Sequence, residues 1–281
     1  MIKSYSFLLS AVMLLVCLPA ESQSKLILKD KFMYANSEVY NAGSNHSISS
    51  LIDTGCSFCI IDSIFAIDSY KVIKDELIPI SVNQSKTKIT SIYVDSISFC
   101  GITYHNVYCL VANLSGLYKQ YAPKFIIGAN ILKSNVWKFD MKNKVIVPYN
   151  NEEKIKGTTY KWKNHKDYSD VALDYIIFDS KVSGKKTRFV FDTGSKNNIL
   201  QKGLYEGKIE RIKKETANIE NSLSVTTAEL CKNVTFEIGK DQYILDFITD
   251  ESNIGLLNIE FLQGRSFILN YKKKKFIILE E

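Results

Sequence analysis

The sequence predicts a mainly β protein, with a few short helices, that is built from two similar units. Short apolar runs with the period-2 alternation of β-strands recur along the chain, and turns rich in Gly, Asn and Ser separate them. The tripeptide Asp-Thr-Gly occurs twice, at residues 53–55 and 192–194, each time directly after an apolar run. The segments that follow the two copies come in the same order, which indicates an internal duplication.

Each unit is expected to begin with a hairpin whose second strand leads into its triplet. A second hairpin, a buried strand that runs into a short helix, and a closing hairpin follow in both units. The apolar segments just after the triplets, 60–67 and 199–212, are each expected to hold one short helix. The matched segments, first unit before second, are turns at 41–44 and 183–186, strands at 47–52 and 187–191, hairpins at 97–111 and 234–248, strand–helix segments at 126–132 and 256–262, and closing hairpins at 136–147 and 266–279.

The N-terminus has the features of a secretory signal. Lys3 supplies the positive charge, and residues 7–18 form an apolar core that is too short to span a membrane. Small residues favour cleavage after Ser22, with Ala20 as the alternative. Cys17 follows a valine where a lipoprotein signal needs a small residue, so lipid anchoring through Cys17 is not expected. The mature protein is expected to be secreted or periplasmic, without stable membrane insertion.

A polar, charged stretch after the first unit is the natural linker between the two units. The expected organisation is a signal peptide at 1–22, a first unit at 23–148, a linker at 149–168 and a second unit at 169–281.

Composition excludes several classes of function. The 281 residues carry a formal net charge of +6 that is spread along the chain, so no nucleic-acid partner is expected. The chain has only three His and a single Cys-x-x-Cys pair, Cys56 and Cys59, so neither a metal site nor any other cofactor is expected. These cysteines are expected to be buried small residues or disulfide partners, and the sequence assigns no pairing. No Gly-x-Ser-x-Gly elbow and no Gly-rich phosphate loop occur.

Two aspartates that a duplicated fold brings face to face are suited to hydrolysis of a peptide bond. Two carboxyl groups in contact cannot both ionise cheaply, so they share a proton. The ionised group can take a proton from a water molecule while the protonated group donates to the scissile carbonyl. This chemistry needs neither a covalent intermediate nor a metal.

The order of triplet, hairpin, strand–glycine–helix and closing hairpin resembles the retropepsin-like aspartic peptidases. The chain is most similar to the bacterial secreted type in which two such units are fused. The resemblance covers nearly all of the mature chain. It implies two closed β-barrel lobes related by a pseudo-twofold axis, with the active site between them. It also implies an aspartic endopeptidase that acts on a peptide or protein substrate and works as a monomer with pseudo-dimeric lobes.

The resemblance also implies roles for individual residues. Asp53 and Asp192 match the catalytic pair, and the residues that support the active-site loops match as well. These are Thr54 and Thr193, whose hydroxyl groups would brace the two loops; Gly55 and Gly194, which allow tight turns; Gly128, which would pack beneath the first loop; and Ser195. Ser195 is expected to donate a hydrogen bond toward Asp192, whereas Cys56 in the first loop is a poor donor. We therefore expect Asp192 to be the ionised member of the pair and Asp53 the protonated one.

Two departures from the family pattern favour an alternative function. Asn258 stands where the second unit should have its packing glycine, with Gly255 nearby as a possible substitute. The expected flaps, near 84–90 and 223–228, lack glycine. The alternative is a catalytically silent protein of the same fold that binds peptides or serves as a scaffold. A peptidase restricted to a single substrate is a third interpretation.

Overall fold

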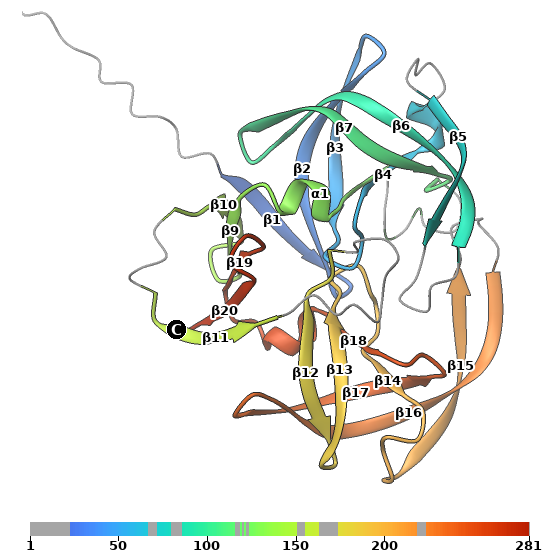
Figure 1. Ribbon diagram of the computed structural model, residues 1–281, viewed down its shortest axis with the longest axis vertical. Coiled ribbons are helices and arrows are strands. Elements are labelled where there is room, and N and C mark those ends of the chain that lie inside the picture. The colour runs from blue at the N-terminus through green and yellow to red at the C-terminus, as the bar shows by residue number, and fades with distance from the viewer. Residues whose placement is uncertain are drawn as a thin grey trace, which may run out of the picture.

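The computed structural model describes residues 23–66, 72–79, 86–115, 119, 121, 124–150, 155–162, 174–217 and 223–280. The expected signal peptide therefore lies outside the described residues. Within these ranges the chain forms twenty strands, whereas α1 (Ala129–Leu132) is a single turn of helix. The prediction of a mainly β protein with a few short helices is confirmed (Figure 1).

The first half of the chain contains ten strands, and the second half repeats their order. The strands of the first half are β1 (Ser24–Lys29), β2 (Phe32–Asn41), β3 (Ser44–Ile52), β4 (Cys59–Asp62), β5 (Val72–Pro79), β6 (Lys86–Phe99), β7 (Ile102–Ala112), β8 (Phe125–Ile127), β9 (Val136–Asp140) and β10 (Val145–Pro148). Those of the second half are β11 (Gly157–Lys161), β12 (Ile177–Val182), β13 (Lys185–Phe191), β14 (Ile199–Gln201), β15 (Ile209–Ala217), β16 (Leu223–Ile238), β17 (Asp241–Asp250), β18 (Gly255–Leu257), β19 (Phe267–Asn270) and β20 (Lys275–Leu279).

Six strands in each half pair in a closed ring. In the first half the order is β2-β3-β8-β4-β7-β6, and β6 pairs back to β2. In the second half β12-β13-β18-β14-β17-β16 has the same order, and β16 pairs back to β12. The less common parallel pairs also recur, because β3 with β8 matches β13 with β18, and β4 with β7 matches β14 with β17. The predicted duplication thus extends to strand direction and register.

The closing hairpins of the two halves join in one sheet. Its strand order is β1-β10-β9-β19-β20-β11, and the antiparallel pair β9–β19 connects the halves (Figure 1). Phe139 and Phe267 lie opposite each other in this pair, both fully buried, with stacked rings 4.3 Å apart. One continuous apolar cluster extends from the first half into the second. Burial of these large side chains is the main stabilising contribution at the junction.

The expected local elements are confirmed with two differences. Residues 60–67 include the 3₁₀ helix η1 (Ser63–Phe65), but 199–212 forms β14, a turn and the start of β15, so the second helix prediction was wrong. The expected linker range contains β11, which pairs with β20. Its polar composition hid a strand that only a partner from the far end of the chain stabilises.

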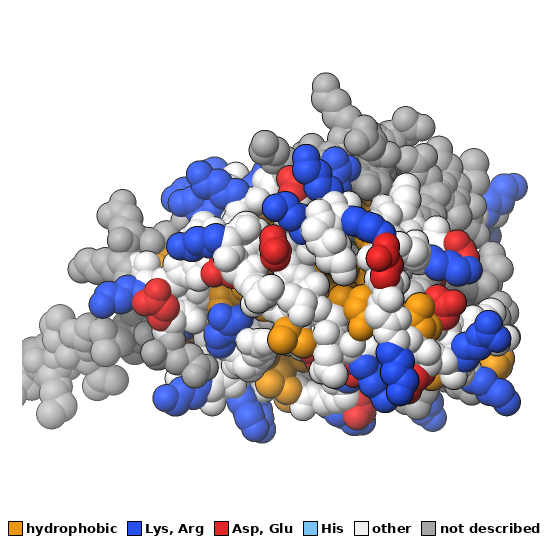
Figure 2. Space-filling model, turned by 90° about the horizontal axis from the view of Figure 1, so that it is seen from below, with side chains coloured by type: hydrophobic (Ala, Val, Ile, Leu, Met, Phe, Trp, Pro, Cys, Tyr) orange, Lys and Arg blue, Asp and Glu red, His pale blue; other side chains and the backbone are white. Residues whose placement is uncertain are grey.

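The surface of the second half carries charges of both signs. In Figure 2 the Lys and Arg side chains are spread over the face, with acidic side chains among them. Several form exposed ion pairs, such as Lys202 with Glu251 and Lys185 with Glu206, each at 2.6 Å. Such pairs contribute little to stability. No helix in the described part of the chain is long and apolar enough to cross a membrane.

Phe267→Ala is expected to lower the free energy of unfolding by about 3–5 kcal/mol, because it removes a fully buried ring from the junction of the halves. Urea denaturation followed by circular dichroism measures the change. Ile244→Ala, at a side chain that is 54% exposed, is the matched control and should change stability by less than about 0.5 kcal/mol. Equal effects of the two substitutions would show that the β9–β19 contact does not hold the halves together.

Candidate active site

Each triplet follows the end of a barrel strand and is held by a neighbouring parallel strand. Asp53 comes directly after β3, and its backbone N–H donates to the carbonyl of Ile127 at 3.0 Å. Asp192 comes directly after β13, and its N–H donates to the carbonyl of Leu257 at 2.8 Å. The repeated strand pairing therefore places the two aspartates in equivalent backbone positions.

Two threonines link the triplets reciprocally. The Thr54 hydroxyl donates to the carbonyl of Phe191, and the Thr193 hydroxyl donates to the carbonyl of Ile52, both at 2.7 Å. Each hydroxyl also accepts the other threonine's backbone N–H, at 3.0 and 3.1 Å. Both side chains are completely buried. Four hydrogen bonds thus join two segments 139 residues apart in the sequence, in the arrangement expected for Thr54 and Thr193.

The two carboxyl groups meet across the triplet glycines. A Cβ atom on Gly55 would lie 2.4 Å from the carboxyl carbon of Asp192, and one on Gly194 would lie 2.4 Å from that of Asp53. Each carboxyl group therefore lies against the other triplet's glycine, and any larger residue there would displace it. Each aspartate also accepts the N–H of its own triplet's glycine, at 2.8 Å for Gly55 and 2.9 Å for Gly194.

Burial raises the pKa of both aspartates. Burial is the first cause of the raised pKa of Asp53, which lies well above its usual range, and the charge of Asp192 is the second. Burial also raises the pKa of Asp192. The hydrogen bonds that its carboxyl group accepts, from the N–H groups of Gly194 and Ser195 and from the Asp53 carboxyl group, oppose the rise. The pair therefore keeps a shared proton at a pH where an ordinary carboxyl group has lost it.

Ser195 does not take the role expected from the sequence. Its hydroxyl donates to the carbonyl of Asn197 at 2.8 Å rather than toward Asp192, so that prediction was wrong. In the first loop, the Cys56 thiol likewise donates to the carbonyl of Phe58, at 2.9 Å. The residue after each triplet thus closes a local turn in both halves. That Asp192 is the ionised member of the pair remains a prediction, and a hydrogen bond from the Ser195 hydroxyl does not support it.

Gly128 lies beneath the first loop, as expected. A Cβ atom there would come within 2.3 Å of the Phe58 carbonyl oxygen. In the second half Asn258 occupies the equivalent position and supports the loop with its amide, which donates to the carbonyl of Lys196 at 2.9 Å. Gly255 packs on the ring of Phe189 instead and does not substitute for the missing glycine.

Two asparagines that the sequence analysis missed complete the support of the loops. Asn130 accepts the N–H of Cys59 and donates to the carbonyl of Tyr108, both at 2.9 Å. Asn198 accepts the N–H of Asn258 at 2.9 Å and donates to the carbonyl of Asp246 at 3.3 Å. The bridging amide comes from the short helix in one half and from the segment before β14 in the other. A search for one shared pattern could not find both.

Two phenols of the second half lie near the aspartates. Burial raises the pKa of Tyr175 and Tyr271, and the charges of Asp53 and Cys56 contribute to both shifts. Both hydroxyls therefore stay protonated at neutral pH. Among the described residues, the Tyr271 hydroxyl is the one buried side-chain oxygen or nitrogen that has no hydrogen-bond partner.

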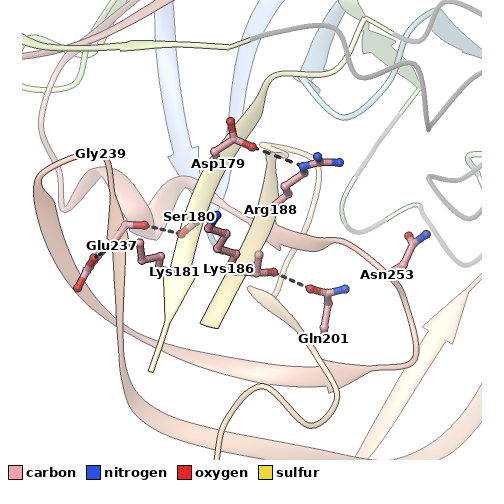
Figure 3. Close-up of a pocket in the computed structure, with 10 residues that line it drawn as sticks. Asp179, Ser180, Lys181, Lys186, Arg188, Gln201, Glu237, Gly239 and Asn253 are labelled. Atoms are coloured by element: carbon pink, nitrogen blue, oxygen red, sulfur yellow. Dashed lines mark hydrogen bonds and ion pairs between the residues drawn. The ribbon is translucent and has the colours of Figure 1, made fainter. Parts of the chain in front are cut away.

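A groove of about 670 Å³ lies elsewhere on the second half, along β12 and β13 (Figure 3). Its polar groups bind one another, because Arg188 pairs with Asp179 at 3.4 Å and the Ser180 hydroxyl donates to the carbonyl of Glu237 at 2.5 Å. These contacts leave no converging set of reactive groups, so the paired aspartates are the stronger candidate site. The parts of the chain that the structure describes also contain no cluster of three His, Cys, Asp or Glu placed to hold a metal.

Comparison with known proteins adds no independent identification. No model of a known protein family matches the chain, and no curated protein matches it significantly.

Thr54→Val is expected to lower the free energy of unfolding by roughly 2–4 kcal/mol. The substitution keeps the shape but leaves the Thr193 N–H and the Phe191 carbonyl buried without this partner. Thr54→Ser retains the hydroxyl and should lose much less. Ser98→Ala, in an exposed Ser98–Thr103 pair, is the control and should have little effect. Chemical denaturation of the four proteins would contradict the bracing role if Val and Ser were equally tolerated.

Asp53→Asn is expected to change how stability depends on pH. Because the folded pKa of Asp53 is raised, its contribution to stability is complete below about pH 4 and is lost as the pH rises through the folded value. The variant cannot ionise there. Its free energy of unfolding should therefore rise relative to the wild type between about pH 4 and pH 7. Urea midpoints at several pH values measure this, and parallel curves would show that the pKa of Asp53 is not raised in the folded protein.

Proposed function

We propose that this protein is an aspartic endopeptidase of the retropepsin-like type, with its two halves acting as pseudo-twofold-related lobes. The observation that carries the proposal is the reciprocal contact of the triplets. Each carboxyl group rests on the glycine of the other triplet, and the threonine hydrogen bonds fix their separation. A pair of buried carboxyl groups that retains one proton is the group that general acid–base hydrolysis of a peptide bond needs.

The proposed reaction uses a water molecule between Asp53 and Asp192. The ionised carboxylate removes a proton from this water as its oxygen attacks the scissile carbonyl carbon. The protonated carboxyl group donates its proton to the carbonyl oxygen, giving a neutral tetrahedral intermediate. Collapse of that intermediate breaks the C–N bond as the amine takes a proton from one carboxyl group. One hydroxyl group of the intermediate returns a proton to the other carboxylate, which restores the singly protonated pair. Fixed carboxyl positions matter because small displacements of the reacting groups slow such steps strongly.

Two small apolar clusters outside the main core support an extended peptide as the substrate. In the first half, Ile89 and Leu110 pack with three partly buried residues, Phe58, Ile60 and Tyr108. In the second half, Ile199, Ala228 and Ile248 form the matching cluster. The strands β4 and β14, which contribute to them, directly follow the two active-site loops.

The remaining parts of the proposal come from the sequence. The segment 1–22 would direct export, and the mature enzyme would act in the periplasm or outside the cell as a monomer. The alternative is a catalytically silent binding protein. Asn258 no longer favours it, because this residue supports its loop by hydrogen bonding where a glycine was expected.

Cleavage of a diverse peptide library by the mature protein tests the proposal. Asp53→Asn and Asp192→Asn should each lower kcat/KM by about 10²–10⁴-fold, because each removes one acid–base group. Activity should also fall as the pH rises through the raised pKa of the pair, since the doubly ionised form has no proton to donate. Asp179→Asn, in the groove on β12 and β13, is the control and should retain full activity.

Other results would redirect the proposal. If the wild type and both variants cut equally, a contaminating peptidase is responsible. If the wild type is silent but binds library peptides, the binding-protein alternative gains support. Cleavage that survives in one variant alone would overturn the shared role of the pair.

A further inference from the structure

Three of the five cysteines that follow residue 22 gather beside the first triplet. Cys59 begins β4 and Cys109 lies in β7, and these parallel strands pair with the two residues directly opposite each other. Both side chains are completely buried. Cys56 is the third, three residues from Cys59. The equivalent positions in the second half, matched through the strand pairing, hold Asn198, Phe247 and Ser195, so the thiols belong to the first half alone.

The two buried thiols are placed to be cross-linked. Paired strands lie about 4.8 Å apart, and disulfides need Cα separations of about 4.4–6.8 Å. The Cys59 and Cys109 side chains are also in contact, because a hydrogen bond between them raises the pKa of the Cys109 thiol. The Cys59 thiol donates to the Asn130 side chain at 3.1 Å, and that acceptor keeps a second donor, the Cys59 N–H, at 2.9 Å. Loss of the thiol proton would therefore leave the loop support intact.

We propose that Cys59 and Cys109 form a disulfide that joins β4 to β7 beneath the first active-site loop. A low-molecular-weight disulfide is the oxidant. The Cys109 thiolate attacks it, giving a mixed disulfide and one released thiol. Cys59 then attacks the Cys109 sulfur of the mixed disulfide, which forms the Cys59–Cys109 bond and releases the second thiol. Two protein thiols are oxidised and one small disulfide is reduced to two thiols.

Cys56 is the competing partner, and its geometry disfavours it. Its thiol is turned toward the carbonyl of Phe58 at 2.9 Å, whereas the Cys59 sulfur faces Asn130 and the N–H of Gly128. Cys100 is buried in the turn between β6 and β7, and Cys231 is buried in β16. Neither has a cysteine opposite it in the described strand pairing. The pairing therefore singles out one disulfide among five cysteines.

The timing of the reaction follows from burial. Burial raises the pKa of the Cys109 and Cys56 thiols, so the folded protein holds very little of either thiolate. Because the thiolate is the attacking species, the folded, reduced protein should react slowly. In the unfolded chain the thiols are exposed to water and have the pKa of a free cysteine. The disulfide is therefore expected to form during folding rather than in the finished structure.

Refolding in glutathione buffer tests the proposal. The reduced, unfolded full chain is refolded with mixed reduced and oxidised glutathione, quenched with acid and alkylated. It is then digested without reduction by chymotrypsin, which cuts after Phe58 and separates Cys56 from Cys59. Mass spectrometry should find the Cys59 peptide joined to the Cys109 peptide with a loss of two hydrogens, and Cys100 and Cys231 alkylated. The linked form should melt about 5–15 °C higher, because the bond closes a long loop in the unfolded chain. Folded, reduced protein should form the bond at least about tenfold more slowly.

Two variants sharpen the assignment. Cys109→Ala should leave Cys59 alkylatable, whereas Cys231→Ala, a buried cysteine on another strand, should retain the linked peptide. The wild-type peptide map decides the question even if one variant folds poorly. Alkylation of all six cysteines of the full chain after oxidative refolding, or a bond between Cys56 and Cys59, would overturn the proposal. The peptide map and the melting temperature do not depend on catalysis, so a failed peptidase assay leaves this test intact.

Discussion

The reciprocal hydrogen bonds of Thr54 and Thr193 are the contact on which the rest of the site depends. Two carboxyl groups held in contact repel each other when both are ionised, and burial adds to that cost. A flexible connection would relieve the repulsion by letting the triplets separate. Four buried hydrogen bonds close to the aspartates, backed by the β9–β19 sheet, oppose that separation. Burial raises the pKa of both aspartates, and the charge of Asp192, held close by these contacts, raises the pKa of Asp53 further.

Duplication supplies the symmetry of the site, and divergence supplies the fit between unlike halves. Lys31, before β2, pairs at 3.0 Å with Glu260, which lies in the 3₁₀ helix η4 (Ile259–Leu262) of the second half. At the position equivalent to Lys31, before β12, Asp174 pairs with Lys133 beside α1 at 2.6 Å. The two equivalent positions thus carry opposite charges. If two copies of the first half were paired, Lys31 would take the place of Asp174 and face Lys133, which has the same charge. Exposed pairs of this kind add little stability, but they discriminate between partners.

The sequence could predict the elements whose signals are local. The triplets, the hairpins and the strand–helix segments each carry their own pattern of apolar alternation and turn residues, and all of them form. What it could not predict depends on partners distant in the chain. β11 is polar and becomes a strand only against β20. Ser195 is a local exception, because its hydroxyl donates to the carbonyl of Asn197 only two residues away, and the sequence does not specify that direction. Asn258 appears in the sequence only as the absence of a glycine, because the acceptor of its amide, the Lys196 carbonyl, lies 62 residues away in the chain.

The same loop is therefore supported by different chemistry in the two halves. In the first half Gly128 packs directly on the Phe58 carbonyl, and thiols fill the space between β4 and β7. In the second half Asn198 and Asn258 span the corresponding gap with amide hydrogen bonds. The first half has one such amide bridge, that of Asn130, and its thiols are weak hydrogen-bond donors until a covalent bond joins them. If both loops must be equally rigid to hold one proton between two aspartates, the thiol-lined half is the one that gains from a cross-link.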